Sequence, residues 1–275
     1  MATIAAQEIG RDPRPDMLSG MPRAHAIDRW IFVAMAAWFI VIVLVGFIPD
    51  AIGKVAAVRA GTHPPFPPIL HVHAVLMASF LLLLLAQSVM MATGRAELHK
   101  QVGIAAFVLV PALVVVGMIL APTIYHTVWD GAHHGPPQVQ AMLTPVIPQL
   151  ENILLLQMHA GILFAIFMTM ALWARKSNSG FHKRMIFLGT AVPLGASIDR
   201  MWWLPNTFPG SPAGTDLYIL VAAVGPLLVW DVIRNRRVHG AYLVWAAIYL
   251  PVSLVMYKLW DTPEWHATAR HIMGV

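Results

Sequence analysis

The stretch HAVLMASFLLLLLAQSVMMATGRAELHK, residues 73–100, decides the fold, because a shorter copy of it, HAGILFAIFMTMALWARKSNSGFHK, occupies residues 159–183. Each copy begins with His-Ala, runs through an apolar stretch and ends on His-Lys. A helix needs about 20 apolar residues to cross the hydrocarbon core of a bilayer. The pattern therefore predicts a duplicated helical hairpin in a membrane, with a histidine near each end.

The composition of the chain is typical of a membrane protein. Hydrophobic residues fill 58% of its 275 positions and charged residues only 11%, whereas soluble domains carry about 25% charged residues. We predict an all-α integral membrane protein with seven transmembrane helices, of which the second to fifth form the duplicated core. The predicted spans are Trp30–Ile48, Leu70–Ala92, Val102–Ala121, Ile153–Trp173, Met185–Trp203, Leu217–Val232 and Ala241–Trp260.

Prolines and one cation-free stretch mark the expected connections. Pro49 is expected to lie at the end of the first span, where a helix breaker belongs. Residues 122–152 carry no lysine or arginine and are expected to form a long outer loop that bears three histidines.

Lysine and arginine set the predicted topology. Thirteen lie in the N-terminal tail and in the second, fourth and sixth loops, against four on the other side. Because cytoplasmic segments are rich in these residues, we predict a cytoplasmic tail (1–28), a seven-helix membrane domain (29–260, with the repeat core at 70–203) and an extracytoplasmic C-terminal tail (261–275). A bacterial inner membrane is the expected location. The net charge of +5 is best interpreted through this topology, and no nucleic-acid binding is predicted from it.

On this topology, His73 and His159 lie at the outer face and His99 and His182 at the inner face. Imidazole is costly inside a bilayer, so the repeated histidines favour a function, and ligation of haem iron is the one we predict. Two axial imidazoles must come from different helices, because the porphyrin lies between them. Two haems at the two faces would form an electron path across the bilayer.

Four segments carry a family resemblance: HAVLMASFLLLLLAQ, GRAELHKQVG, MHAGILFAIF and FHKRMIF. Together they resemble the two-haem transmembrane cytochromes of the cytochrome b-561 type over residues 70–203. The resemblance implies that His73 and His159 ligate an outer haem b, and that His99 and His182 ligate an inner one. The chain departs from that family in having seven predicted spans instead of six. A similar hairpin pattern occurs in uncharacterised bacterial membrane proteins, for which it implies no activity.

Cations at the faces would suit haem propionates. Arg95 and Lys183 are candidates inside, with Lys100 and Arg184, and Arg200 is a candidate outside, with Lys54 and Arg59. The adjacent residues Asp199 and Arg200 would bind a quinone headgroup, a propionate or a proton, or would form a structural ion pair.

Other functions remain open from the sequence. The four histidines are also consistent with solvated interfacial residues. His71, His133 and His134 with His73 and His159 would make an outer copper or zinc site. A cofactor-free accessory subunit of a larger membrane complex is the third hypothesis. The absence of cysteine excludes iron–sulfur clusters and thiolate-ligated haem. Whether the chain is an enzyme or an electron carrier, served by a quinone or a redox partner protein, is left open.

Overall fold

The computed structural model describes residues 26–62 and 64–275, and within them every regular element is helical. The predicted N-terminal tail lies almost wholly outside the described residues. In chain order the helices are α2 (Ala26–Arg59), α3 (Pro68–Ala92), α4 (Ala96–Val102), α5 (Ala106–His134), α6 (Pro137–Leu143), α7 (Ile147–Ala174), α8 (Ser179–Ala191), α9 (Gly195–Ile198), α10 (Pro212–Tyr218), α11 (Gly225–Asn235), α12 (Gly240–Leu259) and α13 (Pro263–Met273).

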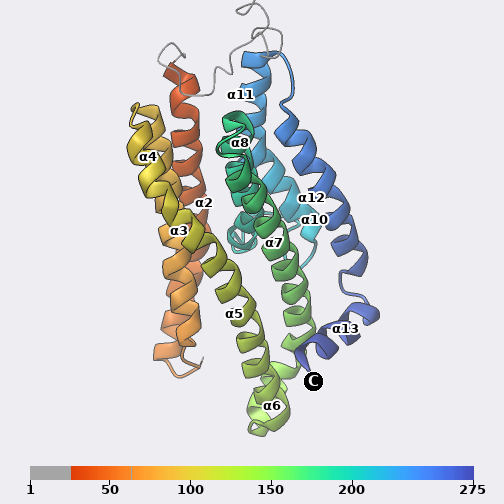
Figure 1. The fold of residues 1–275 in the computed structure, drawn as a ribbon. Helices are drawn as coiled ribbons and strands as arrows, with labels where there is room; N and C mark the ends of the chain where they lie inside the picture. The colour runs from red at the N-terminus through yellow and green to blue at the C-terminus, as the bar shows by residue number, and fades with distance from the viewer. Residues whose placement is uncertain (1–25, 63) are drawn as a thin grey trace, which may run out of the picture.

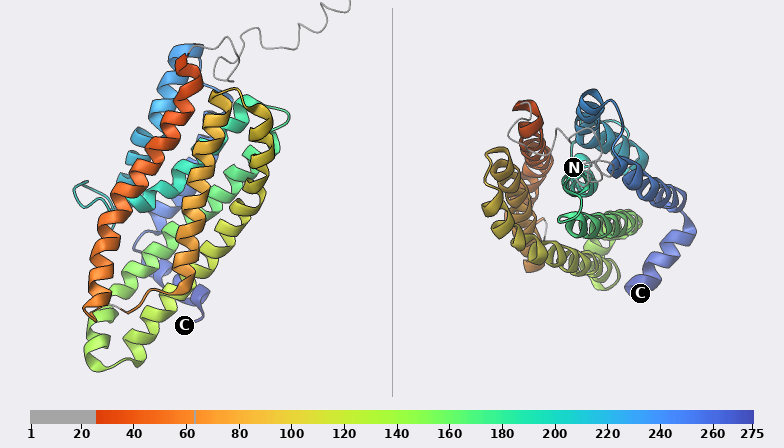
Figure 2. Two further views of the ribbon diagram at one scale, coloured as in Figure 1. Left: turned by 90° about the vertical axis from the view of Figure 1, so that its left-hand side faces the viewer. Right: turned by 45° about the horizontal axis from the view of Figure 1, so that its top comes forward.

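The helices form an elongated bundle with two distinct ends. Figure 1 shows α2, α3 and α5 on one side, α7 and α8 in the middle, and α11 and α12 on the other side. The views in Figure 2 agree with this order. The helix α4, the start of α8 and the C-terminal part of α11 lie at one end, called here the α4 end; α6 and α13 lie at the other, the α6 end.

Six stretches of the described chain are long and apolar enough to cross a membrane, which is the architecture of an integral membrane protein. Large apolar side chains such as Leu82, Val108 and Met118 are exposed on the outside of the bundle, as expected where lipid is the solvent. The six are Ile27–Arg59, Pro68–Ala92, Ala96–His134, Pro137–Ala174, Pro212–Asn235 and Gly240–Leu259.

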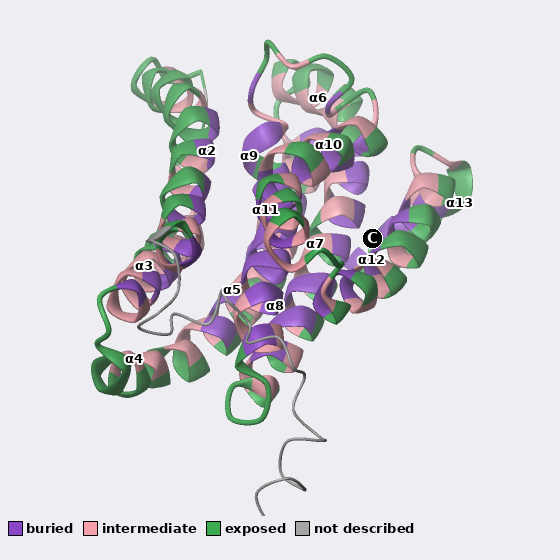
Figure 3. Cartoon of the chain, turned by 90° about the horizontal axis from the view of Figure 1, so that it is seen from above, coloured by how far each residue is buried: buried purple, intermediate pink, exposed green. Residues whose placement is uncertain are grey.

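The predicted fifth span, Met185–Trp203, is a broken helix and does not belong to these six. The α8 helix gives way to a 3₁₀ turn at Val192–Leu194, and α9 ends at Ile198. Most of α8 is buried, and Figure 3 shows it among the buried helices in the middle of the bundle. A helix that protein surrounds needs less apolar surface than one that lipid surrounds, so its polar residues are tolerated.

Two predicted connections are wrong. The first helix does not end at Pro49 but continues to Arg59. Residues 122–152 are not a loop: α5 continues through Pro122 to His134, and α6 and α7 follow almost at once. Prolines are tolerated inside membrane helices because neighbouring groups satisfy the freed carbonyls, and the sequence rule for soluble helices failed here for that reason.

Pro226 illustrates how a neighbouring helix compensates for a proline. A π-helical segment, Ile219–Val224, precedes this residue, and proline cannot bond to the carbonyl four residues earlier. That carbonyl, on Ala222, accepts a hydrogen bond of 2.9 Å from the Trp38 indole of α2. The contact ties α2 to the α10–α11 arm.

Gly46 allows α2 to pack directly on α9. A Cβ at this position would lie 2.1 Å from the carbonyl oxygen of Ser197, so no other residue fits without a shift of the backbone. This contact holds the first helix against the broken helix in the middle of the bundle.

Buried ion pairs hold the α4 end together. Arg184 of α8 is fully buried and pairs with Asp231 of α11, with Nε 2.5 Å from Oδ2. Arg234 of α11 pairs with the fully buried Asp28 of α2 at 2.9 Å. Because each buried carboxylate faces a guanidinium, the desolvation cost of both is offset.

The segment predicted as a C-terminal tail contains a helix, α13, that docks on α7. Glu151 of α7 is fully buried, and its Oε1 accepts from Arg270 at 2.8 Å. Its Oε2 lies 2.7 Å from Nδ1 of His266, and the Trp265 indole donates to its main-chain oxygen at 2.8 Å. Arg270 lies outside the membrane spans, and its hydrogen bond to Glu151 raises the pKa of the guanidinium further above its usual range. The α6 end is thus closed by charge-assisted contacts.

Candidate functional site

An aromatic contact sets the register between the two helices that carry the predicted outer histidines. The rings of Phe80 on α3 and Phe164 on α7 touch, with centroids 5.5 Å apart. His73 precedes Phe80 by seven residues and His159 precedes Phe164 by five. Seven residues are about two helical turns, so His73 lies on the same face of α3 as Phe80. Five residues correspond to a rotation of about 140°, so His159 lies on a different face of α7 from Phe164.

The side-chain contacts of His159 agree with this rotation. Its imidazole is buried, with 7% of the residue exposed, and Nε2 lies 3.0 Å from the Ser253 hydroxyl of α12. Its ring packs edge-on against Tyr249, also of α12, with centroids 5.7 Å apart. The structure therefore does not bring His73 and His159 face to face. The buried Nδ1 of His73 has no hydrogen-bond partner among the described residues.

His159 belongs instead to a polar cluster between α7, α10 and α12, called here the His159 cluster. Asp216 of α10 lies within electrostatic range of His159 and accepts a hydrogen bond of 2.5 Å from Tyr257. Asp199, just after α9, accepts from the Thr215 hydroxyl and from the main-chain nitrogen of Phe208. The members are His159, Asp199, Thr215, Asp216, Tyr249, Ser253 and Tyr257.

Asp199 and Arg200 do not form the ion pair that their adjacency suggested. Arg200 turns to α2, where its Nε lies 3.2 Å from Asp50, and Asp50 also receives Lys54 at 2.8 Å. Arg200 is therefore already engaged, which removes the main reason to expect a haem propionate there.

The two predicted inner histidines both lie at the α4 end of the bundle. His99 of α4 and His182 of α8 lie within electrostatic range of each other. The Nδ1 of His182 lies 2.8 Å from the main-chain oxygen of Ala171, which only accepts, so Nδ1 donates and Nε2 is left with its lone pair. A hydrogen bond from Nδ1 to a main-chain oxygen is the kind of contact that orients a ligating histidine.

Gln87 of α3 orients His99. With its amide oxygen accepting from the Gly103 nitrogen at 3.1 Å, Gln87 donates to the main-chain oxygen of His99 at 3.0 Å and to its Nδ1 at 2.5 Å. In that arrangement the neutral imidazole carries its proton on Nε2. A reversed Gln87 amide would accept from Nδ1 and free Nε2 for ligation, so His99 fits an axial role only after this exchange.

Several cations lie at the same end of the bundle as the inner pair, where they would suit haem propionates. Arg175 stacks on the Phe107 ring at 4.6 Å, and the Lys183 ammonium lies 5.2 Å from the Phe32 centroid. Arg95 is exposed beside α4, and Lys100 pairs with Glu97 on the surface. His182 therefore offers a ligating nitrogen at this end and His99 offers one once the Gln87 amide is reversed, whereas Nε2 of His159 already contacts Ser253.

The histidines of the predicted copper or zinc site lie at separate places. His71 packs edge-on against Phe66, and His133 stacks on Trp129 with Nδ1 2.9 Å from the main-chain oxygen of that tryptophan. His134 lies beside Asp130, exposed at the end of α5. Within residues 26–62 and 64–275, no group of three His, Cys, Asp or Glu side chains is arranged to hold a metal ion.

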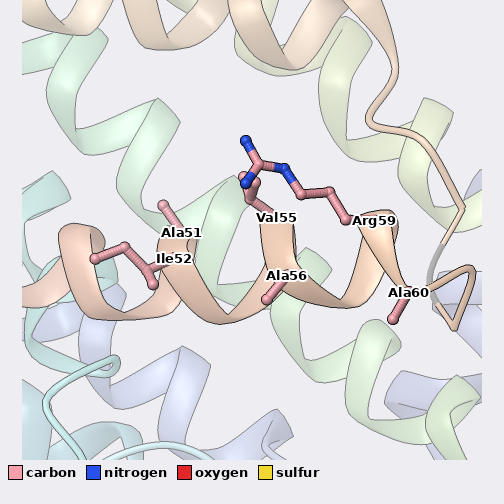
Figure 4. Close-up of a pocket in the computed structure, with 6 residues that line it drawn as sticks. All are labelled: Ala51, Ile52, Val55, Ala56, Arg59 and Ala60. Atoms are coloured by element: carbon pink, nitrogen blue, oxygen red, sulfur yellow. The ribbon is translucent and has the colours of Figure 1, made fainter.

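Neither of two hollows in the bundle adds a cofactor site. One of about 660 Å³ runs along a single helix, α2, and is a shelf on the surface (Figure 4). The other, of about 200 Å³, lies between α2, α5 and α7 and includes Lys54 and Arg200. It is smaller than the roughly 300–1,000 Å³ of usual ligand pockets. The shelf is lined by Ala51, Ile52, Val55, Ala56, Arg59 and Ala60.

The fold and both ends of the bundle define a helical membrane protein with polar groups in its interior. Comparison with protein-family models, with curated proteins and with solved structures found no match. The resemblance to cytochrome b-561 proteins therefore stays a prediction that rests on the residues alone.

The sequence analysis did not predict several residues of the candidate site. Tyr249, Ser253 and Tyr257 recur every four residues in an apolar span, which places them on one face of α12. That periodicity, together with Asp216 in the preceding span, was a usable signal of a polar seam. Gln87 carried no such signal, because only the fold brings it to His99.

Proposed function

We propose that this protein is a membrane-embedded electron carrier that binds one haem b between His99 and His182. The proposal is supported by the placement of these two histidines, which come from separate helical hairpins and lie within electrostatic range of each other at a cation-rich end. A bis-histidine site needs this arrangement of one imidazole from each of two helices.

The proposal includes a membrane topology. The broken helix α8–α9 is taken as a seventh crossing that protein shields from lipid, and α3–α5 with α7–α9 as the two copies of the hairpin. The α4 end, rich in lysine and arginine, is then cytoplasmic, and α13 lies on the extracytoplasmic side of a bacterial inner membrane.

The residues of the α4 end have separate roles in this site. His182 presents Nε2, because the Ala171 oxygen holds its Nδ1 proton. Gln87, with its amide reversed so that its oxygen accepts from Nδ1, would leave Nε2 of His99 free for ligation. Arg95 and Lys183 would pair with the propionates, in the manner of other charge-assisted contacts. When bound, haem b supplies one-electron chemistry.

A single haem at one face suits electron transfer at that face and not across the bilayer. The His159 cluster does not fit a second haem, so the two-haem path across the bilayer is not part of the proposal. The site would exchange electrons with a quinone or a redox partner protein near the cytoplasmic face.

The test is a reduced-minus-oxidised spectrum and a haem-to-protein ratio for the purified full-length chain. We expect about one b-type haem per chain. His182→Ala should abolish the signal, and His159→Ala, a matched change in the other half of the bundle, should retain it. A colourless wild-type protein from haem-replete cells, or loss of haem only in His159→Ala, would overturn the proposal.

A further inference from the structure

Two carboxylates of the His159 cluster differ from the other buried carboxylates in the described chain. Asp28, Asp231 and Glu151 are fully buried, and each has an arginine within ion-pair distance. Asp216 is only 6% exposed, Asp199 is half-buried, and neither has a salt bridge to a cation among the described residues.

The two acids also lie within electrostatic range of each other, so one charge disfavours the second. A buried carboxylate without a cation is costly in a low-dielectric interior, and it normally becomes neutral by taking up a proton. Arg200 is the neighbouring cation, but its Nε is directed to Asp50.

The buried hydroxyl of Tyr249 is an independent indication that the cluster binds a ligand. Its residue is 1% exposed, and its hydroxyl has no hydrogen-bond partner of good geometry among the described residues, although it lies in range of Asp216 and Ser253. A buried hydroxyl without a partner costs about 1–3 kcal/mol. A protonated carboxyl group nearby would offer Tyr249 both a donor and an acceptor.

We propose that the pair of Asp216 and Asp199 holds one exchangeable proton, with His159 as the neighbouring base, in a membrane-embedded proton-binding site. We choose the proton as the ligand because no group of three His, Cys, Asp or Glu side chains in the described ranges is arranged to hold a metal ion. Binding converts one carboxylate to a carboxylic acid, and release returns the proton to water at the α6 end through the half-buried Asp199.

The groups that face this proton come from four parts of the chain. His159 comes from α7, Asp216 from α10, and Tyr249 and Tyr257 from α12. Arg200 follows Asp199 after α9 and is the one cation next to the pair in the described chain. A proton on Asp216 or Asp199 leaves this set with a net charge near zero.

Infrared difference spectroscopy of the full-length protein tests the site. We expect the carbonyl band of a protonated carboxylic acid at neutral pH, shifted by exchange into heavy water. The Asp199→Asn/Asp216→Asn double variant should lack this band. Absence of the band from the wild type, or its persistence in the double variant, would overturn the proposal.

A matched pair of tyrosines on α12 provides a second test in case the double variant fails to fold. The hydroxyls of Tyr249 and Tyr242 are both buried without a hydrogen bond of good geometry in the described chain, but Tyr242 lies beside the Arg184–Asp231 ion pair. Tyr249→Phe should shift the carboxylic acid band and Tyr242→Phe should leave it in place. Equal shifts, or no shift in Tyr249→Phe, would contradict the proposal. Neither result depends on haem, so the two proposals fail separately.

Discussion

The two ends of the bundle treat their histidines and charges differently. At the α4 end, His99 and His182 lie within electrostatic range of each other and the buried aspartates face arginines. Nearer the α6 end, His159 turns to Ser253, and Asp216 is buried without a cation in the described chain. The sequence repeat therefore does not give two equivalent sites. His73 precedes Phe80 by seven residues, but His159 precedes Phe164 by only five, and this difference turns His159 to another face of its helix.

The largest expected effect comes from removing one buried charge at each end. Asp231→Asn leaves Arg184 buried without its counter-ion, and breaking such a pair costs about 3–5 kcal/mol. Asp216→Asn removes a carboxylate that has no salt bridge among the described residues and keeps an oxygen to accept from Tyr257, so we expect a cost below about 1 kcal/mol. Thermal unfolding in detergent measures both. Equal destabilisation would remove the distinction between the two ends.

Gly46→Val should have the next largest effect. The added carbons must displace the Ser197 carbonyl, and overpacking of this kind costs about 1–3 kcal/mol. Gly53 lies seven residues later on the same helix, and a Cβ added there would meet nothing within 4 Å. Gly53→Val is therefore the control and should change the unfolding temperature far less. A similar loss at both positions would mean that the α2–α9 contact contributes little.

The smallest expected effect concerns the carbonyl that Pro226 leaves free. Trp38→Phe removes the indole donor to Ala222, at a cost of about 1 kcal/mol. Trp30 is similarly exposed on α2, at 46% against 43% for Trp38. Trp30→Phe is the comparison for loss of apolar surface alone. Indistinguishable unfolding temperatures for the two variants would show that the hydrogen bond is not needed.

Sequence reasoning predicted the helical membrane architecture well, because apolar length alone decides it. It misplaced the ends of helices at Pro49 and Pro122, where neighbouring helices override the local effect of proline. It also treated α8 as an ordinary apolar span, although burial inside the bundle relaxes the need for apolar residues.

The candidate site was predictable only in part. The predicted topology indicated which end of the bundle each histidine occupies, and a function for the histidines stays a prediction. Which way His159 points depends on the packing of α7 against α12, a long-range contact that no local pattern encodes. The same holds for Asp216 and Gln87, whose partners lie on other helices.

The most direct test of the difference between the two ends is a proximity measurement in the cysteine-free chain. Paired cysteines at 99 and 182, and separately at 73 and 159, would be treated with a short bifunctional thiol reagent in native membranes. We predict efficient cross-linking of His99→Cys/His182→Cys and little for His73→Cys/His159→Cys. Efficient cross-linking of the second pair, or failure of the first, would contradict the proposed difference between the ends.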